Sequence, residues 1–75
     1  MDIQNALYNA LKSKYQSEIH TAKATLLIYF NNSVGIGEHP QHLEEMDKQI
    51  GIIADNEDKL DSLEKHFGNS NWIKN

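Results

Sequence analysis

The sequence contains neither cysteine nor arginine, and each absence excludes a class of protein. Without cysteine the chain can form no disulfide and no zinc site built on thiolates. Arginine is the usual residue for bidentate contacts to phosphate and guanine, so its absence argues against direct, sequence-specific binding of nucleic acid. Proline occurs once and glycine four times among the 75 residues, which leaves long stretches without a helix breaker.

Long hydrophobic runs are missing as well. The longest run of apolar residues spans residues 26–30, whereas a transmembrane helix needs about 20 apolar residues. The first residues show neither the basic segment nor the apolar segment of a signal peptide. The sequence therefore predicts a protein that does not interact with membranes and resides in the cytoplasm, or in the host cytoplasm if it is viral.

The chain is short for a protein that must build its own core. A mass of 8.6 kDa allows at most about 60% of the unfolded surface to be buried, and such domains commonly rely on disulfides, a metal or a partner subunit. Residues 1–37 carry three lysines and two acids, a net charge of +1, and residues 38–75 carry nine acids and four lysines, a net charge of −5. Together they give the −4 of the whole chain, and the opposite charges favour packing of the two halves on each other.

Apolar residues in the first part of the chain recur mostly every four residues, which predicts a helix over about residues 2–32. No glycine or proline interrupts this segment before Gly35. The stripe consists of Ile3, Leu7, Leu11, Tyr15, Ile19, Ala22, Leu26 and Phe30.

The following segment contains the residues of a chain reversal. Two glycines suit a turn over residues 33–39, and Pro40 suits the first position of a new helix. A second apolar stripe predicts a helix over about residues 40–67. Glu57 is the one charged member of this stripe, and we expect it to be partly exposed or paired with Lys14. The stripe consists of Leu43, Met46, Ile50, Ile53, Glu57, Leu60, Leu63 and Phe67.

Two helices of similar length joined by a short turn predict an all-α fold, an antiparallel two-helix hairpin over residues 1–68. The segment 26–30 is apolar around the whole helix, so we expect a second copy to cover what one hairpin leaves exposed, in a homodimeric four-helix bundle. The C-terminal tail, residues 69–75, adds an apolar pair that we expect to dock in cis or in trans. The predicted oligomer interface comprises Tyr8, Leu26, Leu27, Ile28, Phe30, Trp72 and Ile73.

Two histidines and a glutamate near the start of the second helix form the best chemical cluster. His39, His42 and Glu45 are spaced so that neighbouring members share a helix face, and imidazole with carboxylate can bind zinc or nickel. Surface residues of no special role fit the same spacing better, so we predict no metal site and no cofactor. The sequence also lacks a nucleophile elbow and a phosphate loop, and we predict that the protein is not an enzyme.

The stretch from Tyr29 to Pro40, YFNNSVGIGEHP, together with Met46-Asp47 and residues 57–60, resembles small hairpin proteins of unknown function from marine tailed phages. The resemblance covers about residues 7–67 and rests on the turn motif VGIGEHP and on the helical pattern. It implies a viral accessory protein and carries over no catalytic residue.

These observations predict a small non-enzymatic module for self-association or protein interaction. A homodimer is the first expected assembly, and an unidentified protein is a possible further partner. Two alternatives stay open. The acidic second helix suggests a decoy that occupies the site of a nucleic-acid-binding protein, and the histidine cluster suggests a His/carboxylate metal-binding bundle.

Overall fold

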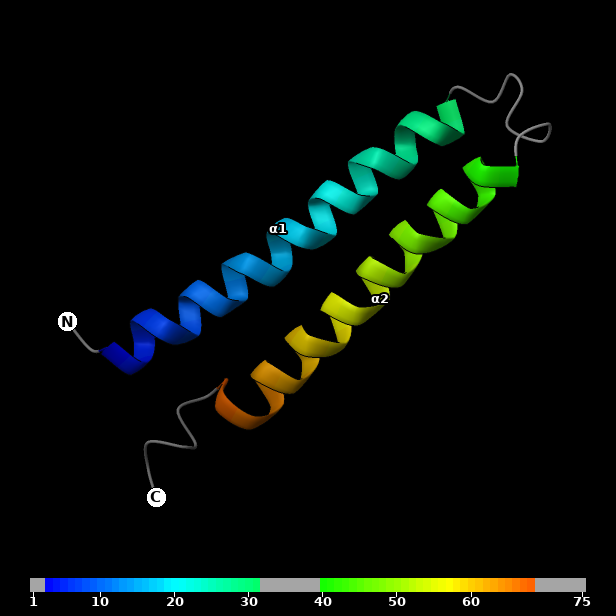
Figure 1. Cartoon of the computed structure of the whole chain (residues 1–75). Coiled ribbons are helices and arrows are strands. Elements are labelled where there is room, and N and C mark those ends of the chain that lie inside the picture. Colours follow the sequence, from blue (N-terminus) through cyan, green and yellow to red (C-terminus); the bar gives the residue numbers. More distant parts are fainter. Residues whose placement is uncertain (1–2, 32–39, 69–75) are drawn as a thin grey trace.

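The structure, a computed structural model, describes residues 3–31 and 40–68. They form two helices, α1 (Ile3–Asn31) and α2 (Pro40–Phe67), which run side by side in opposite directions (Figure 1). Each residue of these two ranges is helical except Gly68. The prediction of an all-helical pair of packed helices is confirmed. We call the end where α1 stops and α2 begins the turn end, and the other end the open end.

The ends of α2 follow from local chemistry. Pro40 occupies the first helical position, where its missing N–H costs no hydrogen bond. At the other end the N–H of Gly68 donates to the carbonyl oxygen of Glu64 at 2.8 Å. A Cβ on Gly68 would collide with that same carbonyl oxygen, so a glycine fits this position best. Lys65 and His66 lie in the last turn, where the helix dipole favours basic side chains.

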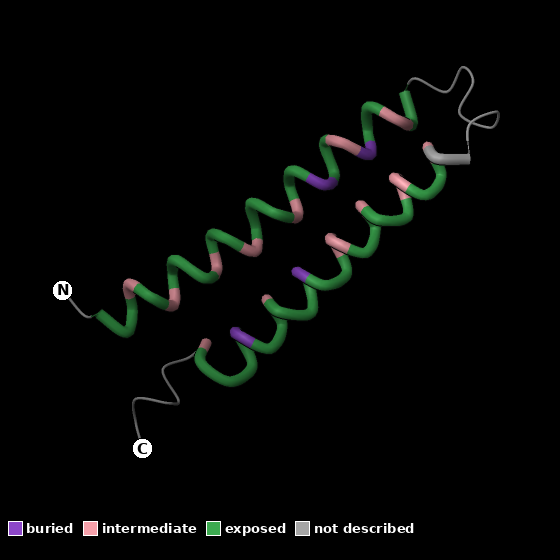
Figure 2. Tube along the Cα trace, viewed as in Figure 1, coloured by how far each residue is buried: buried purple, intermediate pink, exposed green. Residues whose placement is uncertain are grey.

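The core between the helices is very small. Only three hydrophobic residues of the described chain are buried, Ala22 (1% exposed), Leu26 (6%) and Leu63 (8%), and Asn56 (7%) is buried with them. Figure 2 shows the buried positions as short segments on the facing sides of α1 and α2. The hairpin therefore buries much less apolar surface than its sequence offers.

The residues of α1 that face α2 recur every three or four positions, as in a heptad repeat. We call the buried and half-buried facing residues of both helices the inner seam. On α1 the inner seam comprises Tyr8, Lys12, Tyr15, Ile19, Ala22, Leu26 and Tyr29. On α2 it comprises His42, Met46, Gln49, Ile53, Asn56, Leu60 and Leu63.

The predicted apolar stripes are therefore wrong in part. On α1 the exposed residues include Ile3, Leu7, Leu11 and Phe30 of the predicted stripe. Each step of four residues turns about 40° beyond a full circle, because an α-helix turns about 100° per residue. Repeated steps of four therefore wind around the helix, whereas the inner seam alternates three and four and stays opposite one neighbour.

On α2 the structure replaces part of the predicted stripe by the residues one position earlier in the chain. Leu43 and Ile50 were expected to face α1, but both are exposed. His42 and Gln49, the residues before them, are half-buried instead, and Asn56 is buried. These three polar residues of α2 thus face α1, whereas the large apolar residues Leu43 and Ile50 do not.

Candidate interaction surface

Large apolar side chains lie exposed on both helices. Nine of them in the described residues keep between 41% and 71% of their surface accessible to solvent. They are Ile3, Leu7, Leu11, Leu27, Ile28, Phe30, Leu43, Ile50 and Phe67. Scattered exposed leucines are ordinary in soluble proteins, but nine in so short a chain, against three buried hydrophobics, indicate a surface that another molecule can cover.

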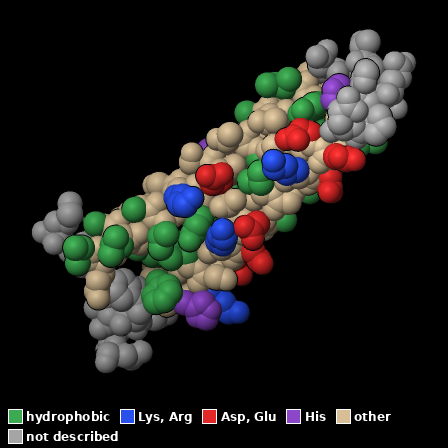
Figure 3. Space-filling view, in the orientation of Figure 1, with side chains coloured by type: hydrophobic (Ala, Val, Ile, Leu, Met, Phe, Trp, Pro, Cys, Tyr) green, Lys and Arg blue, Asp and Glu red, His purple; other side chains and the backbone are tan. Residues whose placement is uncertain are grey.

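Part of this surface forms a groove at the open end. The groove has a volume of about 250 Å³ and is almost entirely apolar. Figure 3 shows hydrophobic side chains gathered over the end of the hairpin where α1 begins and α2 ends. We call this the open-end groove; it is lined by Gln4, Leu7, Tyr8, Leu11, Leu63 and Phe67.

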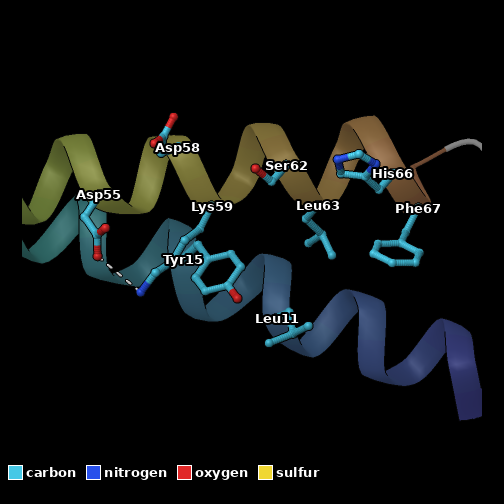
Figure 4. Close-up of a pocket in the computed structure, with 9 residues that line it drawn as sticks. All are labelled: Leu11, Tyr15, Asp55, Asp58, Lys59, Ser62, Leu63, His66 and Phe67. Atoms are coloured by element: carbon cyan, nitrogen blue, oxygen red, sulfur yellow. Dashed lines mark ion pairs between the residues drawn. The ribbon is translucent and has the colours of Figure 1, made fainter.

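A second, more polar hollow of about 370 Å³ continues from the open-end groove towards the middle of the hairpin. In Figure 4, Leu63 and Phe67 point from α2 towards α1, and Asp58 points away from α1. The Lys59 ammonium lies 5.8 Å from the centre of the Tyr15 ring and 3.2 Å from the carboxylate of Asp55. Lys59 is thus paired with a carboxylate of its own helix. We call this side of the hairpin the groove flank.

The opposite side carries a third hollow, of about 420 Å³, whose rim is rich in acids. The Tyr8 hydroxyl donates to the Glu64 carboxylate, and the Lys12 ammonium lies 3.7 Å from the same carboxylate. The bond to Glu64, partial loss of hydration and the negative charge raise the pKa of Tyr8 above its ordinary value of 10.0. We call this side the acid flank; the hollow is lined by Lys12, Gln16, Glu57, Leu60, Asp61 and Glu64.

Three of the expected placements on α1 need correction. Tyr8 was expected to lack a partner within one hairpin, but its hydroxyl bonds to Glu64 of α2. Leu26 was expected at the oligomer interface, but it is buried in the inner seam. The expected pair of Glu57 with Lys14 does not form, because Lys14 reaches Glu18 on its own helix, at 3.9 Å.

The other predicted interface residues divide into two groups. Leu27, Ile28 and Phe30 are exposed on α1, as an interface with a second molecule would require. Trp72 and Ile73 lie outside the described residues.

The candidate metal cluster, which the alternative of a metal-binding bundle would need, finds no support in the parts of the two helices that are described. The His42 ring packs against the Tyr29 ring, with 5.6 Å between the ring centres, which gives this histidine a place in the inner seam. Glu45 is half-buried, and His39 lies outside the described residues. No group of three or more side chains suited to holding a metal ion occurs within residues 3–31 and 40–68.

Sequence reasoning missed the buried asparagine. Asn56 turns its side-chain amide back along α2, and the Nδ2 group donates to the carbonyl oxygen of Ile52 at 2.8 Å. This bond reduces the cost of burying the amide. The sequence offers a signal that does not decide the matter, because His42, Gln49 and Asn56 are spaced by seven residues and so are the residues that follow them. That spacing marks one position of a heptad.

No family model, curated protein or solved structure matches this chain in the comparisons made. The resemblance to phage hairpin proteins therefore stays a prediction, and the turn motif that carries most of it falls largely within residues 32–39, outside the described residues. Neither α1 nor α2 offers a stretch that is both long enough and apolar enough to cross a bilayer.

Proposed function

We propose that the protein is a non-enzymatic self-association module whose functional unit is a homodimer of hairpins arranged as a four-helix bundle. The observation that carries this proposal is the imbalance between nine exposed large apolar side chains and three buried ones. Burial of apolar surface contributes roughly 25 cal/mol per Å², so covering these side chains is the largest stabilisation still open to the chain.

The surface area of the chain supports the same proposal. A compact protein of 8.6 kDa exposes about 4,700 Å², whereas this chain exposes 5790 Å². The excess, about 1,100 Å², is comparable to the roughly 800 Å² that each partner buries in a stable protein–protein interface. A second copy can therefore cover the excess surface without a change in the hairpin.

The orientation of α2 gives a further reason to expect a partner. The helix places His42, Gln49 and Asn56 in the inner seam and leaves Leu43 and Ile50 in solvent. With these polar side chains in the inner seam, the hairpin leaves large apolar side chains uncovered, and their burial by a partner would stabilise the fold. In a four-helix bundle each helix faces two neighbours, and exposed apolar residues such as Leu43 and Ile50 then become part of a common core.

Sedimentation equilibrium at micromolar concentration tests the proposal. The expected mass is twice 8.6 kDa, about 17 kDa, and the midpoint of thermal unfolding should rise with protein concentration, because association stabilises the folded state by mass action. A mass of one chain throughout, together with a midpoint that does not depend on concentration, would contradict the proposal.

A further inference from the structure

The acid flank extends from the open end to the turn end, and helix geometry shows which residues lie on it. Tyr29 and His42 face each other across the inner seam. The next residue along each helix is turned by about 100°, and because α1 and α2 are antiparallel right-handed helices, both steps lead to the same side of the hairpin. Phe30 and Leu43 therefore lie beside each other on one flank, and both are exposed.

Along the rest of the hairpin, too, the residue that follows an inner-seam residue lies on this flank. Glu57 and Glu64 follow the inner-seam residues Asn56 and Leu63, and both line the hollow of the acid flank, so this placement agrees with the structure at the open end. At the turn end the flank is apolar, and Ile50 follows Gln49 in the same way. The exposed apolar members of the acid flank are Leu27, Phe30, Leu43 and Ile50.

Charge on the acid flank is divided between the two helices. Four of the α2 residues that directly follow an inner-seam residue are carboxylates, namely Asp47, Glu57, Asp61 and Glu64. On α1 the same positions between Ser13 and Phe30 carry Lys23 and no acid. The α2 edge of this flank is therefore strongly acidic, and the α1 edge is weakly basic.

We propose that a second copy of the chain covers the acid flank in a parallel two-fold arrangement, in which α1 of each copy lies on α2 of the other and both turn ends are at the same end of the bundle. The inference rests on the proposed self-association. A two-fold axis can relate two hairpins stacked on this flank in two ways, because the axis is either perpendicular or parallel to the helices. An axis perpendicular to the helices places α2 on α2 and brings the carboxylates of both copies together, which is destabilising. An axis parallel to the helices places the acidic edge on the basic edge.

The parallel arrangement also matches apolar residues with apolar residues. Residues at the same distance from the turn meet across the interface, because the axis does not shift the copies along their length. Phe30 of one copy then lies level with the partner's Leu43, and Lys23 lies level with the region between the partner's Asp47 and Ile50. Apolar contacts at the turn end, with Lys23 of one copy beside the partner's Asp47, follow from one symmetry operation.

Spin labels at two positions of α2 test the arrangement. The chain contains no cysteine, so Glu44→Cys and Lys65→Cys each provide one labelling site, and both residues are exposed. In a parallel dimer the two copies of each label lie at the same height along the bundle. Both label-to-label distances then reflect only the lateral spacing between the two α2 helices. In any antiparallel dimer at least one pair is separated by at least about 32 Å along the axis, because the two sites are 21 helical steps apart at about 1.5 Å each.

A matched pair of substitutions tests the flank itself. Ile50→Glu adds a fifth carboxylate to the acid flank and should raise the dimer dissociation constant by about 100-fold, as loss of a central apolar anchor does at many interfaces. Ile28→Glu is the control, because Ile28 is also an exposed isoleucine of the hairpin but lies two residues after Leu26, off this flank. It should change the dissociation constant by about threefold or less. Circular dichroism checks that both variants stay helical.

The outcomes separate the inference from the proposed function. A wild-type chain that stays monomeric overturns both. A dimer with one long label distance leaves self-association intact and overturns the parallel arrangement. A dimer that withstands Ile50→Glu but dissociates with Ile28→Glu overturns the choice of flank. Two short, similar label distances and selective dissociation by Ile50→Glu support the inference.

Discussion

The turn-end half and the open-end half of the hairpin hold α1 and α2 together by different means. In the turn-end half the small side chain of Ala22 lets the helices approach, Leu26 is buried beside it, and the Tyr29 and His42 rings pack on each other. Among the described residues of the open-end half, Leu63 is the only hydrophobic residue that is buried. The polar contacts between the helices there include the Tyr8–Glu64 hydroxyl–carboxylate bond, the exposed Lys12–Glu64 ion pair and the Lys59 ammonium near the Tyr15 ring.

This difference indicates where the stability of the hairpin resides. Exposed ion pairs contribute about 0–1 kcal/mol each, whereas a fully buried leucine contributes roughly 1.5–3 kcal/mol. The turn-end half therefore carries most of the stability, and the polar contacts of the open-end half mainly fix the register of the helices. Three comparisons between variants test this view, from the largest expected effect to the smallest.

Removal of a buried side chain from the turn-end half should have the largest effect. Leu26→Ala is expected to lower the free energy of unfolding by about 2–5 kcal/mol, because it leaves a cavity in the inner seam. For a two-helix protein this loss is enough to unfold most of the chain. Urea denaturation followed by circular dichroism measures the change.

The matched control lies at the open end. Leu7→Ala removes the same atoms from a side chain that is 61% exposed and should cost about 0.5 kcal/mol. Equal losses for the two variants would show that the halves do not differ in the way described.

One glycine in each half gives the second comparison. Gly51 is an exposed helical residue with nothing within 4 Å of an added Cβ, so Gly51→Ala should stabilise the fold by about 1 kcal/mol through the higher helix propensity of alanine. Gly68→Ala should destabilise it by about 1 kcal/mol, because the added Cβ would collide with the Glu64 carbonyl oxygen. Thermal unfolding at one fixed protein concentration measures both, and shifts of the same sign would refute this account.

The smallest expected effect concerns the pH dependence of the open-end half. The bond to Glu64 raises the pKa of Tyr8 above its ordinary value of 10.0, so the neutral hydroxyl is favoured in the folded chain. The resulting stabilisation is complete below pH 10 and is lost as the pH rises through the folded-state pKa. The difference between the ultraviolet titrations of the wild type and Tyr8→Phe should show a midpoint above 10.

Glu64→Ala is the control for this titration. Without the carboxylate, the Tyr8 midpoint should fall towards the ordinary value, because both the accepting oxygen and the negative charge are gone. A midpoint for Tyr8 that is the same in the wild type and in Glu64→Ala would exclude Glu64 as the cause of the shift.

Most of the architecture could be predicted from the sequence. The uninterrupted segment before Gly35, the glycines of the turn and Pro40 at the start of α2 are local signals, and local signals suffice to place helices and a reversal. The candidate surface was predicted less well. Leu27 and Ile28 were expected to lie off the stripe that faces the other helix and are exposed. Phe30 was placed both in that stripe and at an interface and is exposed, and Leu26 was placed at an interface but lies inside the inner seam.

The sequence by itself determined the two helices, their junction and the division of charge between them, because each depends on neighbouring residues and on composition. The tertiary structure alone decided which face of each helix is inside. On α2 the choice lay between Leu43 with Ile50 and His42 with Gln49, one residue apart. That choice depends on how two helices at a 3.5-residue repeat fit together over their whole length, and the spacing within one helix does not contain that information.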